Sequence, residues 1–197
     1  MELRTLAAAY DRSAAAYDEQ FRPLQRVKYR AAARLLGPFL RSGGGLGPRA
    51  LVLDAGAGTG LFAEWLLDPA EPHAPLRAAL AAPLRAGRLL ALDLSPRMVE
   101  RSRARGAAAL VADLARPPLR PGSCALVLSF TSLLEQVPAG LSALGALVAP
   151  GGALCLGMLA AESRRPELLA RQSGLTHLLG PLEAGQDLLH LLVHPRR

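Results

Sequence analysis

The fold of this chain is decided by residues 50–62, which read ALVLDAGAGTGLF. Residues 50–53 form a short apolar run without alternation, and such runs suit a strand buried on both faces of a parallel sheet. Gly56, Gly58 and Gly60 follow, and glycine reaches backbone conformations that side chains forbid. Glycines here also let a ligand lie against bare main chain at the N-terminus of a helix. The stretch therefore predicts a strand, a ligand-binding turn and the start of a helix.

Strands and helices alternate along the rest of the chain. The expected strands are residues 50–54, 89–93, 108–112, 125–130 and 153–159, followed by a hairpin of residues 175–182 and 188–193. The expected helices are residues 60–67, 96–105, 133–148 and 166–173. This alternation predicts a doubly wound α/β fold with a seven-stranded Rossmann-like sheet, mostly parallel, that ends in an antiparallel hairpin. Residues 68–87 are interpreted as an insertion that loops out beyond the first helix, away from the ligand.

Two helices are expected before the first strand. Apolar residues spaced by three and four within residues 3–21 place one stripe along a first helix. Pro23, a favourable first helical residue, is expected to begin a second helix. The glycine-rich residues 41–48 then indicate a flexible linker. The chain is therefore divided into a helical lid with its linker, residues 1–48, and a core of residues 49–197.

Composition and charge narrow the class of protein. The chain has 197 residues, of which 51% are hydrophobic, and this suffices for one α/β domain with a sizeable core. The net charge of +7 raises the question of a nucleic-acid partner. However, Lys28 is the sole lysine and the arginines are scattered, so a solvated basic surface is favoured over an RNA-binding patch.

Neither a metal site nor a membrane anchor is predicted. Cys124 and Cys155 lie within apolar runs, and no Cys/His cluster has ligand spacing. The charged N-terminus is unlike a signal peptide. Residues 141–161 carry no charge, but they contain Pro150 and are read as a helix leading into a buried strand rather than a membrane span. A cytoplasmic protein without a membrane span is therefore expected.

Three successive strands are each expected to end in an aspartate, namely Asp54, Asp93 and Asp113. A lone aspartate there often caps a turn. In parallel sheets, however, ligands bind at the carboxyl ends of the strands, where these residues come together with Ser129 of the fourth strand. A carboxylate after the second strand can accept both ribose hydroxyls, and one after the third can meet the amino group of a base. The glycine spacing differs from the Gly-x-Gly-x-x-Gly of nicotinamide sites, so a different nucleoside cofactor is predicted.

These motifs resemble those of class I S-adenosylmethionine-dependent methyltransferases. Four stretches carry the resemblance in the family's order: residues 52–60 (VLDAGAGTG), 90–98 (LALDLSPRM), 111–114 (VADL) and 147–154 (LVAPGGAL). Residues 9–18 (AYDRSAAAYD) are also similar to the N-terminal helix of many members that act on small molecules. The resemblance therefore implies S-adenosylmethionine as the cofactor and a lid formed by the N-terminal helices.

The resemblance also implies a role for particular residues. Gly56, Ala57 and Gly58 would lie against the methionine part of the cofactor, Asp54 would support their loop, and Tyr17 would touch the amino-acid end from the lid. Asp93 would take the ribose hydroxyls, and Leu94 and Met98 would pack near the adenine. Asp113 would face the adenine amine with Leu114 beside it, and Ser129 would line the inner wall of the pocket.

The sequence assigns no catalytic residue. Methyl transfer from a sulfonium is an in-line displacement, so the protein mainly aligns the reactants and excludes water, and a general base is optional. Glu135 is the only acidic residue shortly after the fourth strand and is expected at a solvated helix position. The Asn/Asp-Pro-Pro-aromatic signature of enzymes that methylate amide or base nitrogens is absent from residues 129–136. A small-molecule acceptor is predicted, with RNA or protein methylation and a non-catalytic cofactor-binding protein as alternatives.

Overall fold

The computed structural model describes residues 3–42, 46, 49–71, 74–133, 137–161 and 165–196. The strands are β1 (Leu51–Ala55), β2 (Leu89–Asp93), β3 (Ala108–Val111), β4 (Cys124–Phe130), β5 (Val148–Leu159), β6 (Thr176–Ala184) and β7 (Asp187–Val193). The helices are α1 (Leu3–Arg41), α2 (Leu61–Leu67), α3 (Ala74–Arg85), α4 (Pro96–Ala104), α5 (Val137–Leu147) and α6 (Pro166–Ser173). The predicted strands are confirmed, although β5 begins at Val148 instead of residue 153.

The strands form one seven-stranded sheet in the order β3-β2-β1-β4-β5-β7-β6. Strands β1 to β5 pair in parallel, whereas β7 is antiparallel to both β5 and β6. The predicted doubly wound sheet with a C-terminal hairpin is thus confirmed. The strand order reverses between β1 and β4, and the crevice at such a point is where α/β sheets bind ligands.

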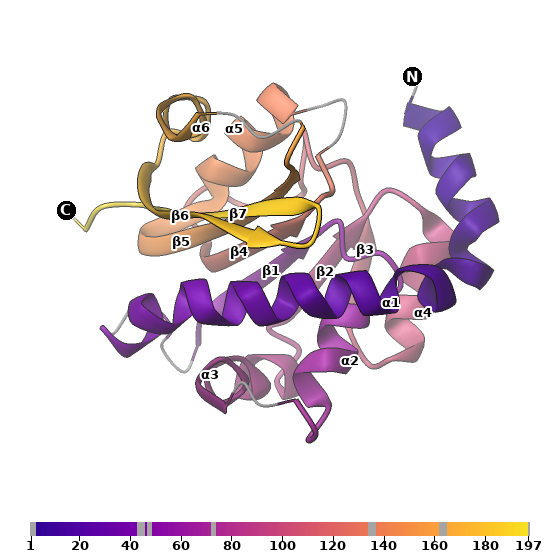
Figure 1. The fold of residues 1–197 in the computed structure, drawn as a ribbon. Coiled ribbons are helices and arrows are strands. Elements are labelled where there is room, and N and C mark those ends of the chain that lie inside the picture. Colours follow the sequence, from indigo (N-terminus) through magenta and orange to yellow (C-terminus); the bar gives the residue numbers. More distant parts are fainter. Residues whose placement is uncertain are drawn as a thin grey trace.

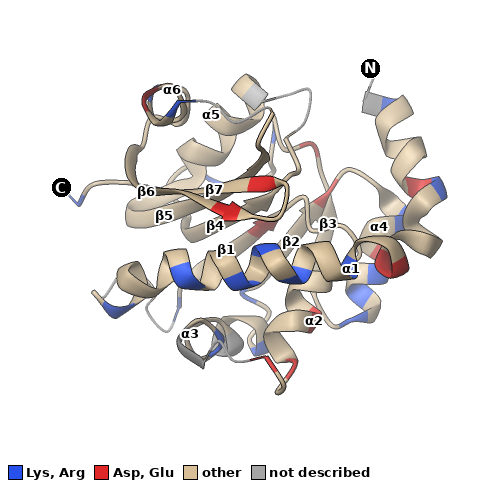
Figure 2. Ribbon diagram, viewed as in Figure 1, with Lys and Arg blue, Asp and Glu red and all other residues tan. Residues whose placement is uncertain are grey.

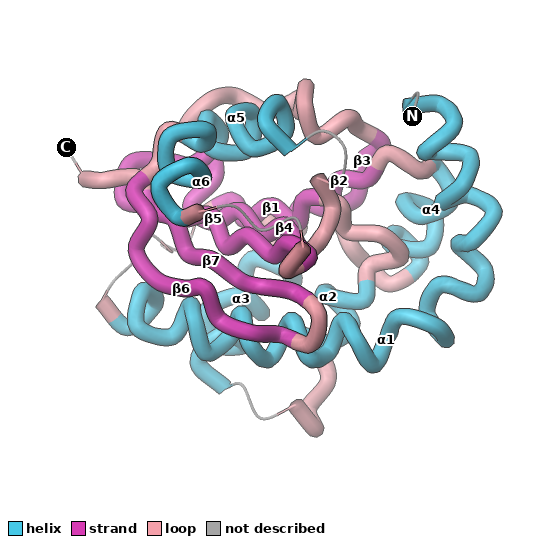
Figure 3. Tube along the Cα trace, turned by 45° about the horizontal axis from the view of Figure 1, so that its top comes forward, coloured by secondary structure: helices cyan, strands magenta, loops and turns pink. Residues whose placement is uncertain are grey.

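Helices cover both faces of the sheet. Helices α1, α2 and α3 lie on one face and α5 and α6 on the other (Figures 1 and 3). Adjacent residues of β1 serve the two layers in turn, because side chains alternate along a strand: Val52 packs into the core under α1 to α3, and Leu53 into the core under α5. Both side chains are fully buried, which explains the unbroken apolar run in the sequence.

The expectation of two N-terminal helices is wrong, because α1 is one helix of 39 residues. Pro23 and Pro38 both lie inside it. A proline in a helix interior removes one hydrogen bond and usually kinks the helix. Figure 1 shows this bend: the first turns of α1 run along one side of the molecule, and the remainder crosses the sheet. Contacts on both sides of Pro23, described below, hold the two parts in one continuous helix.

The interpretation of residues 68–87 as a segment that loops out is also wrong. Most of this stretch is the helix α3. Leu76, Leu80 and Leu84 recur every four residues, are buried, and belong to the core under α1. A helix with such a stripe buries it against the sheet. The stretch therefore covers the sheet between β1 and β2.

Two other expectations concern the linker and the uncharged stretch. The glycine-rich linker lies mostly outside the described residues. Residues 141–161 form the end of α5 and then β5, as predicted. Among the described helices, none combines the length and the apolar character needed to cross a bilayer.

Candidate functional site

The glycine turn after β1 is fastened to the end of β2. The N–H groups of Gly56 and Ala57 donate to the carbonyl oxygen of Leu92, at 2.7 and 3.0 Å. Gly56 has a φ of +78°, and a Cβ added there would collide with the Ser132 side chain. Only glycine fits this position, because the backbone is left-handed and packed against the loop after β4. The turn thus presents bare main chain to the crevice.

Asp93 connects the glycine turn to the start of α4. One carboxylate oxygen accepts from the Gly58 N–H at 2.8 Å, and the other accepts from the Ser95 N–H at 2.9 Å. Burial raises the pKa of Asp93, while these backbone hydrogen bonds oppose the rise. A carboxylate offers about four lone-pair positions. Backbone groups of Gly58, Ser95 and Leu94 use up to three of them, so Asp93 keeps part of its acceptor capacity for a diol.

A cavity of about 760 Å³ opens beside these residues. Of the residues predicted to bind the cofactor, it brings together Tyr17, Gly56, Gly58, Asp93, Leu94, Met98, Asp113 and Leu114. The other lining residues are Leu6, Tyr10, Phe130, Thr131, Ser132 and Leu133. The first set comes mainly from the ends of β1, β2 and β3, and the second from α1 and the end of β4. The cavity therefore has an acidic part, where Asp93 and Asp113 lie, and a part that Tyr10 and Tyr17 of α1 close.

Asp54 and Ala57 lie in a smaller adjoining cavity of about 270 Å³. It shares Tyr17, Gly56 and Phe130 with the main cavity. Asp54 is 3% exposed, and its pKa is raised to about 7 by burial and by the charge of Asp93.

Ser129 lies behind the cavity wall. It is fully buried, and its hydroxyl is 2.7 Å from that of Ser132. Ser132 in turn donates to the carbonyl oxygen of Ala55 at 2.9 Å and lines the main cavity. Ser129 thus supports Ser132, which the sequence did not single out. Glu135 lies outside the described residues.

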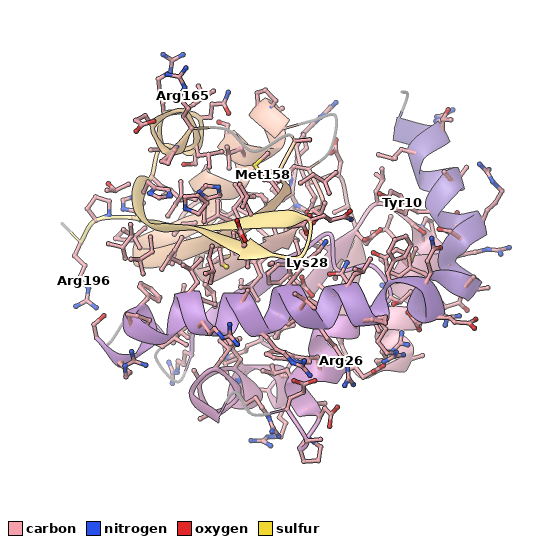
Figure 4. The ribbon with its side chains drawn as sticks, in the orientation of Figure 1. Tyr10, Arg26, Lys28, Met158, Arg165 and Arg196 are labelled. Atoms are coloured by element: carbon pink, nitrogen blue, oxygen red, sulfur yellow. The ribbon has the colours of Figure 1, made fainter. Side chains whose placement is uncertain are left out.

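Helix α1 carries two Tyr-Asp pairs, Tyr10-Asp11 and Tyr17-Asp18, seven residues apart. Seven residues are about two helical turns, so equivalent residues of the two pairs lie on one side of the helix. Both tyrosines line the cavity, and Figure 4 shows Tyr10 between the first turns of α1 and the body of the molecule. Burial is the largest cause of the raised pKa of Tyr10 and of the pKa of about 12 of Tyr17. Both therefore remain neutral phenols near neutral pH.

The two aspartates fasten α1 to the glycine turn and to the start of α4. Asp11 accepts from the Ser95 hydroxyl at 2.5 Å and from the Arg97 N–H at 3.1 Å. Ser95 is the N-cap of α4, where its hydroxyl also accepts from the Met98 N–H at 3.1 Å. Asp18 accepts from the Thr59 hydroxyl in the glycine turn. The repeated Tyr-Asp pattern thus places the two tyrosines over the cavity, while the two aspartates bind the glycine turn and the N-cap of α4.

Ion pairs of arginines also attach α1 to α4, to α2 and to the loop after α2. Asp18 also pairs with Arg101 of α4 and with Arg105, the C-cap residue of α4. Although burial works against it, hydrogen bonds from Thr59 and these arginines hold the pKa of Asp18 below its ordinary value. Further along α1, Arg22, Arg26 and Arg30 recur every four residues and pair with Glu64, Asp68 and Glu71 of α2 and the following loop. Figure 2 shows several basic residues spaced along α1.

Lys28 points away from these arginines, toward the hairpin formed by β6 and β7. Figure 4 shows Lys28 and Arg26 on different sides of α1. Lys28 is buried, forms an ion pair with the fully buried Asp187 of β7, and donates to the Thr131 hydroxyl at 2.8 Å. Thr131 donates to Asp187 at 2.7 Å and has a φ of +57°, a conformation uncommon for a residue other than glycine. Because Thr131 lines the main cavity, this network fixes one part of its wall.

The residues fit S-adenosylmethionine on several observations of this structure. The glycine turn leaves a cradle beside Ser132 and Tyr17 that side chains would fill. Asp93 retains acceptor positions, and Asp113 faces the same cavity while its carboxylate accepts from the Ala115 N–H at 2.9 Å. Apolar Leu94, Met98 and Leu114 lie beside them. Such a set suits a ribose, an adenine and an amino acid in one extended ligand.

The sequence places the chain in the same class. Residues 53–156 match the model of the methyltransferase-domain family. The chain belongs to this family of class I S-adenosylmethionine-dependent methyltransferases, which confirms the resemblance found in the sequence. The chain is 33% identical over 166 residues to the malonyl-[acyl-carrier protein] O-methyltransferase of Serratia marcescens. The alignment covers 81% of this chain and 54% of that protein, so the chain spans about half the length of this curated relative.

Solved structures show the same fold. A putative methyltransferase in complex with the Trm112 methyltransferase activator of Haloferax volcanii superposes with a TM-score of 0.64 at 18% identity, covering 94% of this chain and 97% of that one. The magnesium protoporphyrin IX methyltransferase of Synechocystis PCC 6803, with bound SAH, gives a TM-score of 0.59 at 15% identity, covering 87% and 84%. At these identities the similarity concerns the fold alone.

Proposed function

We propose that the protein transfers a methyl group from S-adenosylmethionine to a small acceptor that carries a carboxylate. The observation that carries the cofactor part is the cavity in which the glycine turn, Asp93 and Asp113 meet under α1. Family membership and the SAH bound to the Synechocystis enzyme support the same cofactor.

The chain's residues would bind and orient the reactants. Asp93 would accept hydrogen bonds from the ribose hydroxyls, Asp113 would accept one from the adenine amine, and the main chain at Gly56 and Gly58 would lie against the methionine part. When bound, the cofactor supplies a sulfonium methyl whose departure leaves a neutral thioether. Helix α1 closes the cavity and would exclude water, and Tyr10 and Tyr17 line the cavity as neutral phenols. Alignment and water exclusion are the main requirements of such a transfer.

The acceptor must arrive as a nucleophile. Among the described residues that line the main cavity, Asp93 and Asp113 are the only carboxylates, and both serve the nucleoside. Since the neutral tyrosines are poor bases near neutral pH, an acceptor that is already ionised suits the site. A carboxylate is ionised at neutral pH. The relative from Serratia marcescens, named for malonyl-[acyl-carrier protein], supports a malonyl thioester as the acceptor class.

The net charge of +7 is weak support for an RNA acceptor. Arg22, Arg26, Arg30, Arg101 and Arg105 are engaged in ion pairs within the chain. These pairs hold α1 on α2 and α4, so these five of the 23 basic residues have a structural use. A small-molecule or carrier-bound acceptor is therefore favoured over a polyanion.

The test offers the purified protein S-adenosylmethionine with a malonyl thioester, with bulk RNA, or with no acceptor. We expect S-adenosylhomocysteine to form, together with the methyl ester of the thioester, only in the first reaction. Asp93→Ala should abolish turnover, because two hydrogen bonds to a carboxylate, about 1.5–3 kcal/mol each, are lost. Methylation of RNA instead would refute the acceptor class. Absence of S-adenosylmethionine binding in calorimetry would refute the proposed cofactor as well.

A further inference from the structure

The segment after β4 forms a wall of the main cavity next to the glycine turn. In the sheet order β3-β2-β1-β4, Asp113 follows β3, Asp93 ends β2, the glycine turn follows β1, and Thr131 follows β4. All of them line the same cavity. A cofactor that lies along the ends of β3, β2 and β1 would leave the end of β4 for a second molecule. The wall at Thr131 is therefore the one that an acceptor would meet.

The hydroxyl of Thr131 is fully committed to other side chains. It donates to the Asp187 carboxylate at 2.7 Å and accepts from the Lys28 ammonium at 2.8 Å. A hydroxyl has one proton to donate, and here that proton goes to Asp187. The Thr131 N–H in turn donates to the carbonyl oxygen of Gly157 at 2.8 Å. These contacts fix the residue in place and leave its hydroxyl no proton for a ligand.

The conformation of Thr131 requires such restraint. Its φ of +57° is a genuine outlier for a β-branched residue, and such a conformation persists only where the surroundings over-determine it. Here a buried cation and a buried anion hold one hydroxyl, and hydrogen bonds to charged groups are the strong ones. The chain then continues to Ser132, whose hydroxyl donates to the carbonyl oxygen of Ala55 at 2.9 Å. The left-handed turn at Thr131 thus sets the path of the cavity wall.

We propose that Lys28 and Asp187 are positioning residues for the methyl acceptor, acting through Thr131. Neither side chain is among the described residues that line the main cavity. The contacts that hold the glycine turn and Asp93 involve neither of them. Their effect is therefore on the acceptor wall and not on the cofactor. This inference rests on the proposed function and assigns to α1 and β7 a part in binding its acceptor.

The experiment removes the Thr131 hydroxyl and leaves the ion pair in place. Thr131→Val keeps the shape of the side chain, whereas Thr131→Ser keeps the hydroxyl. With malonyl coenzyme A as the acceptor, we expect Thr131→Val to raise the KM for the thioester at least about fivefold. Its affinity for S-adenosylhomocysteine in calorimetry should not change, and Thr131→Ser should behave like the wild type. Thr176→Val, at an exposed position of β6, is the matched control and should alter neither quantity.

A second set of variants separates positioning from stability. Lys28→Met combined with Asp187→Leu removes the network without stranding a charge, and it should raise the KM for the thioester as Thr131→Val does. Adding Thr131→Gly should restore much of the affinity for the acceptor, because glycine adopts a positive φ without support. A general loss of stability would not be relieved in this way, since glycine also increases the entropy of the unfolded chain.

Three results would overturn the proposal: an unchanged KM in Thr131→Val, an equal weakening of S-adenosylhomocysteine, or no recovery on adding Thr131→Gly. A wild type that does not methylate malonyl coenzyme A would refute the proposed acceptor, and hydrogen exchange then decides the positioning role. The peptide over residues 128–133 should exchange faster in Thr131→Val than in Thr176→Val. Equal exchange in the two variants would show that the network does not hold this wall.

Discussion

At the scale of single residues, Asp54 is the carboxylate whose ionisation the fold changes most clearly. Burial and the charge of Asp93 raise its pKa from 3.8 to about 7, and Tyr17 and Tyr29 of α1 face it as neutral groups. Between about pH 4 and pH 7 the folded protein therefore holds a proton that the unfolded chain has released. This contribution to stability is complete below pH 4 and is lost as the pH rises through 7.

Asp54→Asn should remove this pH dependence in the ligand-free protein. The difference in free energy of unfolding between wild type and variant should change by up to about 1.4 kcal/mol per pH unit over the interval. Urea denaturation at several pH values measures it. The lowered pKa values of His177 and His190 act in the opposite direction but cancel in the difference. Glu100→Gln, at an exposed site, should give a flat difference; the same flat result for Asp54→Asn would contradict the raised pKa.

Residues at strand ends were predictable, whereas their supporting residues were not. Asp93 and Asp113 were identifiable because a short apolar run fixes where a strand ends, and the sheet rule then fixes which edge they occupy. Ser132 and Thr131 follow a strand without any such pattern. Their place at the cavity depends on the path of the loop after β4, which is set by contacts with Ala55 and Asp187.

At the scale of elements, α1 is the helix whose bounds were predicted least accurately from the sequence. Apolar spacing predicted helical structure on both sides of Pro23, but the proline suggested a boundary. The lost hydrogen bond is outweighed where both parts are anchored by tertiary contacts. Asp18 anchors the part before Pro23, and Arg26 and Lys28 anchor the part after it.

Replacing both Asp11 and Asp18 by Asn should release the first half of α1. The charged acceptors for Ser95, Thr59 and the α4 arginines are lost, so residues 3–20 should exchange amide hydrogens faster, while exchange in β4 stays unchanged. Hydrogen exchange followed by mass spectrometry measures this. Glu19→Gln, an exposed neighbour on the same helix, is the matched control. Unchanged exchange in the double variant would show that the tyrosines and apolar contacts alone hold the lid.

At the scale of the whole molecule, Lys28 joins α1 to the C-terminal hairpin across the sheet. The pair with Asp187 is buried, and Asp187 Oδ1 has no hydrogen-bond partner among the described residues. Removing one partner of a buried ion pair leaves an uncompensated charge and typically costs about 3–5 kcal/mol. The residues involved are far apart in sequence, so the pair ties the two ends of the chain together.

Lys28→Met should therefore lower the free energy of unfolding by about 3–5 kcal/mol in chemical denaturation. Adding Asp187→Leu should recover part of the loss, because the stranded carboxylate is removed as well. Arg34→Met, an exposed cation on the same helix, is the control and should change stability by no more than about 0.5 kcal/mol. An equal effect of Lys28→Met and Arg34→Met on the free energy of unfolding would show that the buried pair contributes no more to stability than an exposed cation does.

The sequence by itself determined the order of strands and helices, the glycine turn and the aspartates that line the main cavity. These features depend on local periodicity and on backbone geometry that particular residues require, so they can be read from neighbouring positions. Only the tertiary structure decided that α1 is one helix, that residues 68–87 cover the sheet, and that Lys28 pairs with Asp187. Those outcomes depend on burial and pairing between segments far apart in the chain, where the free energy of packing outweighs local preference.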